Sequence, residues 1–137
     1  MNIFENYLVR INKIILDNQR LLKLVNLEKL NSINLEVPPE HVNFDLSSNI
    51  SLVLAKSNNI NPSKLAIDIK NLLLKNIKDF DSIDIAGPGF LNMKLSKDGT
   101  ISNIENILKN KETYGSKKSN QNYNIEFVSA NPTGPMH

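Results

Sequence analysis

The chain has no cysteine among its 137 residues. This absence excludes disulfide bonds, zinc sites built from thiolates and a cysteine nucleophile within this sequence. It is compatible with a reducing compartment, and we expect a cytoplasmic protein. Histidine is almost as scarce. His41 lies beside a proline turn and is interpreted as a surface residue, and the other histidine is His137.

Long apolar runs are absent as well. No run approaches the roughly 18 residues that could span a bilayer, and the first residues lack the basic and apolar regions of a secretory signal. A strong charge of either sign is also missing, because the formal net charge is only +2. This balance permits contact with nucleic acid but does not indicate it. We therefore expect no membrane partner.

The residues that are present suit one compact domain, with 40% hydrophobic and 22% charged side chains. Residues 2–24 carry apolar side chains at helical spacing and predict an amphipathic helix that Asn2 could cap. The stripe is interpreted as core, with a partner-binding helix as the alternative. Its members are Ile3, Phe4, Tyr7, Leu8, Ile11, Ile14, Ile15 and Leu22.

Four short runs predict strands. Residues 33–37 and 43–46 supply the first two. Residues 82–86 and 90–95 alternate apolar and polar side chains, as half-buried strands do. Gly87-Pro88-Gly89 joins the last two runs and is the best candidate for a β-hairpin turn in the chain.

Helix signals lie between these strands. One helix begins at Ser47 or Ser48, and Asn61-Pro62 marks a second start with asparagine as N-cap and proline at N1. The second segment covers residues 63–78 and presents one apolar face, formed by Leu65, Ile69, Leu72, Leu73 and Ile77.

A last helix is predicted over residues 100–111, after a turn at Asp98-Gly99. Ser102 and Glu105 have the spacing of a capping box. Its apolar residues are Ile101, Ile104, Ile107 and Leu108.

Residues 115–122 contain no apolar side chain and are interpreted as a linker. They separate residues 1–114 from residues 123–137. The element order before the linker is α-β-β-α-β-β-α, which predicts an α+β domain with a small, mostly antiparallel sheet.

The most informative segment follows the linker. Residues 123–128 predict a strand, which delivers polar side chains into a loop rich in proline and glycine that reaches His137. Nucleotide-binding α/β sheets present ligand groups at the carboxyl ends of their strands in this way. Such a strand needs partner strands and helices to bury it. We therefore expect this chain to be the front of a larger enzyme, truncated as its active site begins.

Residues 126–137, Glu-Phe-Val-Ser-Ala-Asn-Pro-Thr-Gly-Pro-Met-His, resemble the first catalytic strand and the start of the His-x-Gly-His signature of arginyl-tRNA synthetases, which are class I aminoacyl-tRNA synthetases. His137 matches the first histidine of that signature. Residues 85–92, Ile-Ala-Gly-Pro-Gly-Phe-Leu-Asn, and strings within residues 35–56 are similar to the amino-terminal domain of the family. The chain departs from the family at Asn43-Phe44-Asp45, where members often have His-Gly-Asp.

The resemblance implies an amino-terminal additional domain of α+β class over residues 1–114, followed by the first strand of a Rossmann-like α/β catalytic domain. It implies a cytoplasmic, monomeric arginine-tRNA ligase that forms arginyl-adenylate from arginine and ATP with Mg2+, and then transfers arginine to tRNA(Arg). No tightly bound cofactor and no protein ligand of a metal are implied. The 137-residue chain alone holds one strand of the catalytic sheet, so we expect it to be inactive.

Four residues of the terminal segment receive roles from the resemblance. Glu126 would contact the substrate arginine, because a carboxylate holds a guanidinium through two hydrogen bonds. Ser129 and Asn131 would hold its amino and carboxyl groups. His137 would be the catalytic residue that binds the ATP phosphates and stabilises charge as the adenylate forms. The alternatives are an exposed edge glutamate, a local turn before proline and a histidine without a role.

Phe90 and Asn92 match residues with which the family reads the D-loop at the tRNA elbow. An aromatic ring can stack on an unpaired base, and an amide can bond to the edge of a base. The alternative places Phe90 in the core and Asn92 at an exposed strand position. For the whole chain, the alternatives are a free-standing, non-catalytic RNA-binding module and a structural domain without a role in RNA binding.

Overall fold

A computed structural model describes residues 2–116, 120 and 122–126 of the chain. Its centre is a four-stranded sheet of β1 (Leu35–Glu36), β2 (Leu46–Ser48), β3 (Phe80–Ala86) and β4 (Phe90–Leu95). The strand order is β1-β2-β4-β3, and every neighbouring pair is antiparallel. The small antiparallel sheet expected from the sequence is therefore confirmed.

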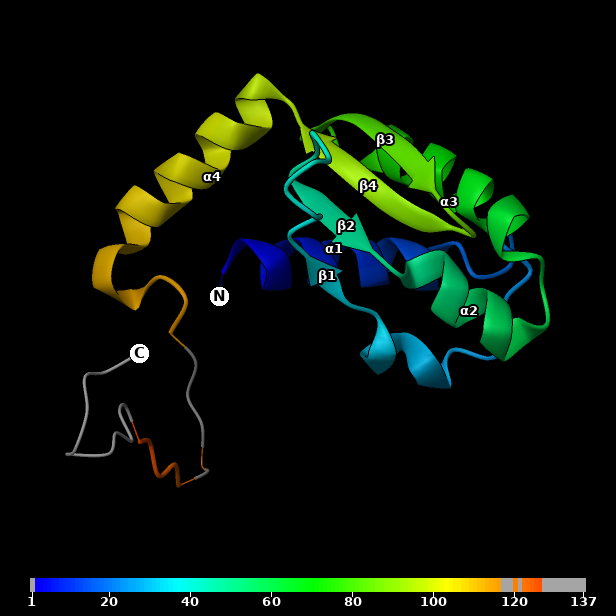
Figure 1. The fold of residues 1–137 in the computed structure, drawn as a ribbon, viewed down its shortest axis with the longest axis horizontal. Helices are drawn as coiled ribbons and strands as arrows, with labels where there is room; N and C mark the ends of the chain where they lie inside the picture. The colour runs from blue at the N-terminus through cyan, green and yellow to red at the C-terminus, as the bar shows by residue number, and fades with distance from the viewer. Residues whose placement is uncertain (1, 117–119, 121, 127–137) are drawn as a thin grey trace, which may run out of the picture.

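Helices cover one face of this sheet. Figure 1 shows α1 (Ile3–Asp17) and α3 (Pro62–Asn76) behind the strands, with α2 (Ile50–Asn58) beside them. The fourth helix, α4 (Lys97–Asn110), leads away from the end of β4 (Figure 1). Two short 3-10 helices, Glu28–Ser32 and Lys111–Thr113, complete the described elements. No helix in this part of the chain is long and apolar enough to cross a membrane.

The first helix begins where the sequence predicts but ends sooner. Asn2 accepts a hydrogen bond from the backbone of Glu5, whose side chain bonds back to the backbone of Asn2, so a capping box starts α1. The prediction that the helix reaches residue 24 is wrong. It ends at Asp17 because Asn18 caps it and its side-chain amide donates to the carbonyl of Ile14. Leu22 is still buried, but it lies in a turn that follows the helix and not in the helix itself.

Two helices separate β2 from β3, in agreement with the two predicted helix starts. The predicted order α-β-β-α-β-β-α lacks one of them and is wrong, because the order is α-β-β-α-α-β-β-α. Asn59 ends α2 in the left-handed conformation, with φ of 52°. Asn61 then caps α3 by accepting from the backbone of Lys64, with Pro62 at the first turn. The predicted start of this helix is confirmed. The chain reverses between the two helices, and both can cover the sheet.

The core lies between the helices and the covered sheet face. All five apolar residues predicted on the face of α3 are buried, and α1 and the strands supply most of the others. Burial of such side chains contributes roughly 1.5–3 kcal/mol each. The largest fully buried side chains include Tyr7, Ile11, Ile15, Leu46, Ile50, Leu54, Leu65, Ile69, Leu73, Ile77, Ile83 and Leu91.

The last helix differs from its prediction at its beginning. It starts one turn earlier, because the side chain of Ser96 accepts from the backbone of Gly99 at 3.0 Å. Asp98-Gly99 therefore lies inside the first helical turn and is no separate turn, and Ser102 with Glu105 forms no cap. The apolar side chains of this helix, Ile101, Ile104, Ile107 and Leu108, are exposed.

The start of the predicted second domain falls partly within the described residues. Residues 123–126 form no strand. The expected strand over residues 123–128 is thus not observed in its described part, and residues 127–137 lie outside the described residues. A strand of a parallel sheet forms by pairing with neighbours. The Rossmann-like strand and the domain boundaries remain predictions.

Gly99 packs so closely that a side chain does not fit. A Cβ atom at this position would lie 2.5 Å from the carbonyl oxygen of Asp79, which is backbone and cannot rotate away. We predict that Gly99→Ala lowers the free energy of unfolding by about 1–3 kcal/mol, more than the gain of about 1 kcal/mol in helix propensity. Urea denaturation of the chain measures this. Ser102→Ala, on the exposed side of the same helix, should stay within about 0.5 kcal/mol of the parent. Equal stability of the two variants would contradict the contact.

Candidate functional site

Alternation along β4 divides its side chains between two faces of the sheet. Leu91 and Met93 are fully buried under the helices. Phe90, Asn92 and Lys94 point to the other face, which no helix covers in Figure 1. Paired positions on the neighbouring strands share that face. We call it the outer sheet face; its members are Glu36, Ser47, Ser82, Asp84, Ala86, Phe90, Asn92 and Lys94.

Phe90 stands at the end of the β3–β4 hairpin, and the hairpin turn is held from behind. The hydroxyl of Ser51, fully buried at the start of α2, donates to the carbonyl of Gly89, and Ser63 in α3 donates to the carbonyl of Pro88 at 3.4 Å. Gly89 has φ of 143°, a conformation that favours glycine. These contacts fix the turn on the beginnings of two helices and so fix the position of Phe90.

Phe90 is 37% exposed and Asn92 is 8% exposed. The alternative interpretation of this pair, with Phe90 in the core and Asn92 exposed, is therefore wrong for both residues. The side-chain oxygen of Asn92 accepts a hydrogen bond of 2.8 Å from the hydroxyl of Ser47 on β2. Among the described residues its side-chain nitrogen has no acceptor. The structure thus presents an aromatic ring and a fixed amide on one face of one strand.

Lys94 lies at the far end of the same face. Its ammonium group donates to the side chains of Asn43, at 3.1 Å, and Asp45, at 3.4 Å. The other carboxylate oxygen of Asp45 accepts from the backbone of Leu95 at 2.8 Å. Asp45 is the one residue of Asn43-Phe44-Asp45 that agrees with the family pattern, and its position explains why an aspartate suits it. It ties the start of β2 to the end of β4.

The outer sheet face carries charges of both signs. Lys94 is paired with Asp45, and the exposed carboxylate of Asp84 lies 4.0 Å from Lys70. Glu36 adds a further exposed carboxylate at the edge. Such a face does not attract phosphates strongly, because its cations are already near anions. Besides these charges, the face presents the ring of Phe90 and the amide of Asn92.

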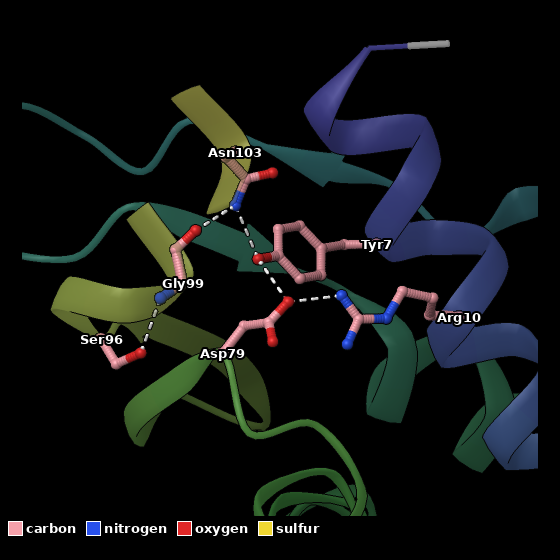
Figure 2. A network of polar contacts seen from close by, with 6 residues as sticks. All are labelled: Tyr7, Arg10, Asp79, Ser96, Gly99 and Asn103. Carbon is pink, nitrogen blue, oxygen red and sulfur yellow. Dashed lines mark hydrogen bonds and ion pairs between the residues drawn. The ribbon is translucent and has the colours of Figure 1, made fainter. Parts of the chain in front are cut away.

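A second polar cluster joins α1, α4 and the segment before β3, and Figure 2 shows its members. The hydroxyl of Tyr7 donates to Asp79 at 3.1 Å, and Arg10 donates to the same carboxylate oxygen. Asn103 donates to the Tyr7 oxygen at 2.8 Å and to the carbonyl of Gly99 at 2.7 Å. The Arg10 guanidinium also lies over the Tyr7 ring, 5.1 Å from its centroid.

The electrostatics of this cluster indicate a structural role. The hydrogen bond from Arg10 holds the pKa of Asp79 below its usual value, while burial raises the pKa of Tyr7. Both groups therefore keep their ordinary charge states near neutral pH, and each is bonded within the cluster. Tyr7 and Asp79 are 72 residues apart, so no local spacing in the sequence could reveal the cluster.

Of the four residues predicted to bind substrates in the terminal segment, the structure describes only Glu126. Glu126 is exposed and belongs to no helix or strand. Ser129, Asn131 and His137 lie outside the described residues. Their roles remain predictions. His41 is exposed, as expected. Among the described residues, no three histidine, aspartate or glutamate side chains gather closely enough to hold a metal ion.

Comparison with known proteins identifies the fold. The family model described as the arginyl tRNA synthetase N terminal domain matches residues 10–95. The chain belongs to this family. The matched range runs from α1 to the end of β4 and therefore includes Phe90 and Asn92. The recognition from the sequence motifs is confirmed.

Relatives with assigned names agree. The chain is 42% identical over 146 aligned positions to an arginine–tRNA ligase of Pelagibacter ubique strain HTCC1062, covering 100% of this chain and 24% of the relative. It is 43% identical over 141 positions to the arginine–tRNA ligase of Bartonella quintana strain Toulouse, with the same coverage. For Rickettsia bellii strain OSU 85-389 the values are 41% over 114 positions, with 82% of this chain and 20% of the relative covered. The chain spans about a quarter of the length of these arginine–tRNA ligases.

The lowered pKa of Asp79 predicts how the stability of this domain depends on pH. A carboxylate whose pKa is lower in the folded state stabilises the fold above its unfolded pKa, about 4, and this contribution is lost as pH falls through the folded pKa. We predict that Asp79→Asn lowers the free energy of unfolding by about 1 kcal/mol at pH 7. The difference from the parent should shrink as the pH approaches 3.

Urea denaturation at several pH values measures this difference. Asp81→Asn, an exposed carboxylate two residues away, is the control. A difference between Asp79→Asn and the parent that stays constant from pH 7 to pH 3 would rule out the charged interaction.

Proposed function

We propose that this chain is the amino-terminal part of an arginine-tRNA ligase and that its outer sheet face contacts tRNA(Arg). The observation that carries the proposal is the partly exposed ring of Phe90, held beside the fixed amide of Asn92 on a sheet face without helices. Family membership supports it, because the relatives are named arginine–tRNA ligases. Contact with the D-loop at the tRNA elbow is the role that we assign to this face.

The chemistry of the two side chains suits an unpaired base. A base that has left its stack loses its neighbours, and an aromatic ring can replace one of them for about 1–3 kcal/mol. The amide of Asn92 can then bond to the edge of the base, because its oxygen is already held by Ser47 and its orientation is set. Pre-ordering of both groups lowers the entropy that binding must otherwise lose.

The mixed charge of the outer sheet face suits a local contact with tRNA. It does not suit a surface that supplies most of the affinity for tRNA. Its cation, Lys94, is shared with Asp45, and carboxylates of Asp84 and Glu36 lie on the same face. A surface that neutralised many phosphates would need unpaired lysines or arginines. We therefore assign to this domain the recognition of one feature of the tRNA, and assign most contacts with the tRNA backbone to the rest of the enzyme.

The terminal segment would supply the first substrate contacts of the catalytic domain. Glu126 would bind the guanidinium of arginine, while Ser129 and Asn131 would hold its amino and carboxyl groups. His137 would donate to phosphate oxygens of ATP and stabilise the charge that develops as arginyl-adenylate forms. Magnesium would accompany ATP as substrate. We propose that the complete enzyme acts as a monomer in the cytoplasm.

The first prediction concerns Phe90 in the complete enzyme. Phe90→Ala should raise the Kd for tRNA(Arg) about tenfold, because a stacking contact of roughly 1–3 kcal/mol is lost. Phe90→Tyr keeps the ring and should bind nearly as the parent does. Ile67→Ala removes an exposed apolar side chain from α3, on the helical side of the domain, and is the matched control. Equal Kd values for Phe90→Ala and Ile67→Ala, with both variants folded, would contradict the proposal.

Asn92 requires a control for stability, because it is buried and bonded to Ser47. Asn92→Ala and Ser47→Ala break the same hydrogen bond, so each should lower the free energy of unfolding by about 1–3 kcal/mol. Asn92→Ala alone removes the amide and should weaken tRNA binding beyond the effect of Ser47→Ala. If the two variants bind tRNA equally well, Asn92 supports the sheet and does not contact RNA.

A further prediction concerns the 137-residue chain by itself. It should show no arginine-dependent exchange of pyrophosphate into ATP, even with tRNA(Arg) present, because one segment of the catalytic sheet cannot enclose the reactants. The complete enzyme is the positive control. Pyrophosphate exchange by the 137-residue chain would contradict the proposal that the active site needs the remainder of the enzyme.

A further inference from the structure

Helix α4 carries two stripes of side chains on opposite sides. Asn103, Asn106 and Asn110 form one stripe, and Ile101, Ile104 and Leu108 form the other with the same spacing. The two sets are displaced by two residues, which is about 200° of rotation in a helix of about 3.6 residues per turn. The two stripes therefore cannot face the same surface.

The asparagine stripe faces the domain. Asn103 bonds to the hydroxyl of Tyr7 on α1. Asn106 and Asn110 line a shallow hollow together with Asn6 of α1. Both Asn103 and Asn106 are partly buried, whereas almost every other residue of the helix beyond Gly99 is exposed. The side of α4 that meets its own domain is thus polar.

The opposite stripe is apolar and exposed. Ile101 is 43%, Ile104 51% and Leu108 65% exposed, and Ile107 at the edge of the stripe is 42% exposed. A surface helix of a globular protein normally turns its apolar stripe inward and its polar side to water. This helix has the reverse arrangement with respect to residues 2–96. Three large aliphatic side chains in one row, with a fourth at its edge, therefore indicate a partner other than this domain.

We propose that the apolar stripe of α4 packs against the catalytic domain that follows in the complete enzyme. Two observations select this occupant. The relatives extend over about four times the length of this chain, since the alignments cover 24% of them. In addition, α4 is the last α-helix among the described residues and precedes residues 123–137, which resemble the start of the catalytic domain, so the stripe lies close to that domain in the sequence.

The size of the stripe favours a tethered partner over a second copy of the chain. Four aliphatic side chains that are about half exposed offer a few hundred Å2, well below the roughly 800 Å2 per partner of a stable, freely associating interface. A domain on the same chain is held at an effective concentration in the millimolar range. A small apolar contact is sufficient under that condition. The contact would also set the direction in which the outer sheet face is presented to tRNA.

Hydrogen exchange of the backbone amides of residues 101–109 tests the proposal, measured without tRNA in the 137-residue chain and in the complete enzyme. We expect exchange to be at least about tenfold slower in the complete enzyme, because packing suppresses local opening. In the complete enzyme, Ile104→Lys with Leu108→Lys should restore the faster rate. Ser102→Lys, also exposed on α4 but outside the stripe, should not.

Equal exchange rates in the two proteins would overturn the proposal. Protection in the 137-residue chain that rises with its concentration would also overturn it, because a second copy would then be the partner. The inference rests on the part of the proposed function in which a catalytic domain follows. Aminoacylation and tRNA affinity, measured separately on the same complete enzyme, report on the proposed function. If these measurements showed that the domain does not contact tRNA, the hydrogen-exchange result would still test the packing of α4.

Discussion

The alternation of side chains along β4 is the constraint on which the rest of this domain depends. This central strand has neighbours on both sides, so its backbone is fixed by β2 and β3. Leu91 and Met93 are then committed to the core, and Phe90 and Asn92 to the opposite face. A slip of one residue would exchange the two sets. The same register that buries the core therefore presents the side chains that we assign to tRNA contact.

The helices support this arrangement from one side only. Ser51 and Ser63 hold the hairpin turn at the beginnings of α2 and α3. Asp79 connects α1 to the start of α4, through Tyr7 and Arg10 on one side and the close approach of Gly99 on the other. The hairpin turn next to Phe90 is therefore fixed by hydrogen bonds from two helices. The last helix of the domain is joined through polar contacts and leaves its apolar stripe for another domain.

Signals contained within a few residues of sequence were sufficient for much of the fold. The caps at Asn2 and Asn61, the Gly87–Gly89 hairpin turn and the apolar face of α3 each depend on local geometry, and the structure contains all of them. Features that depend on distant contacts could not be predicted in this way. The two-residue strand β1 and the orientation of α4 are decided by packing. The spacing of apolar residues predicts that a helix has an apolar stripe, but it does not predict which surface the stripe faces.

The candidate site also combines residues that sequence motifs indicate with residues that only the structure reveals. The residue strings gave roles to Phe90 and Asn92, but none to Ser47, Ser51 or Asp45, which hold them and the surrounding strands in place. The most direct test of the account replaces Phe90 in the complete enzyme by a photoreactive benzoyl-phenylalanine and maps the cross-links to tRNA(Arg). We predict cross-links in the D-loop, and none when the same group replaces Ile67 on α3. Cross-links confined to the acceptor stem or the anticodon, or equal yields from the two positions, would contradict the assignment of the outer sheet face.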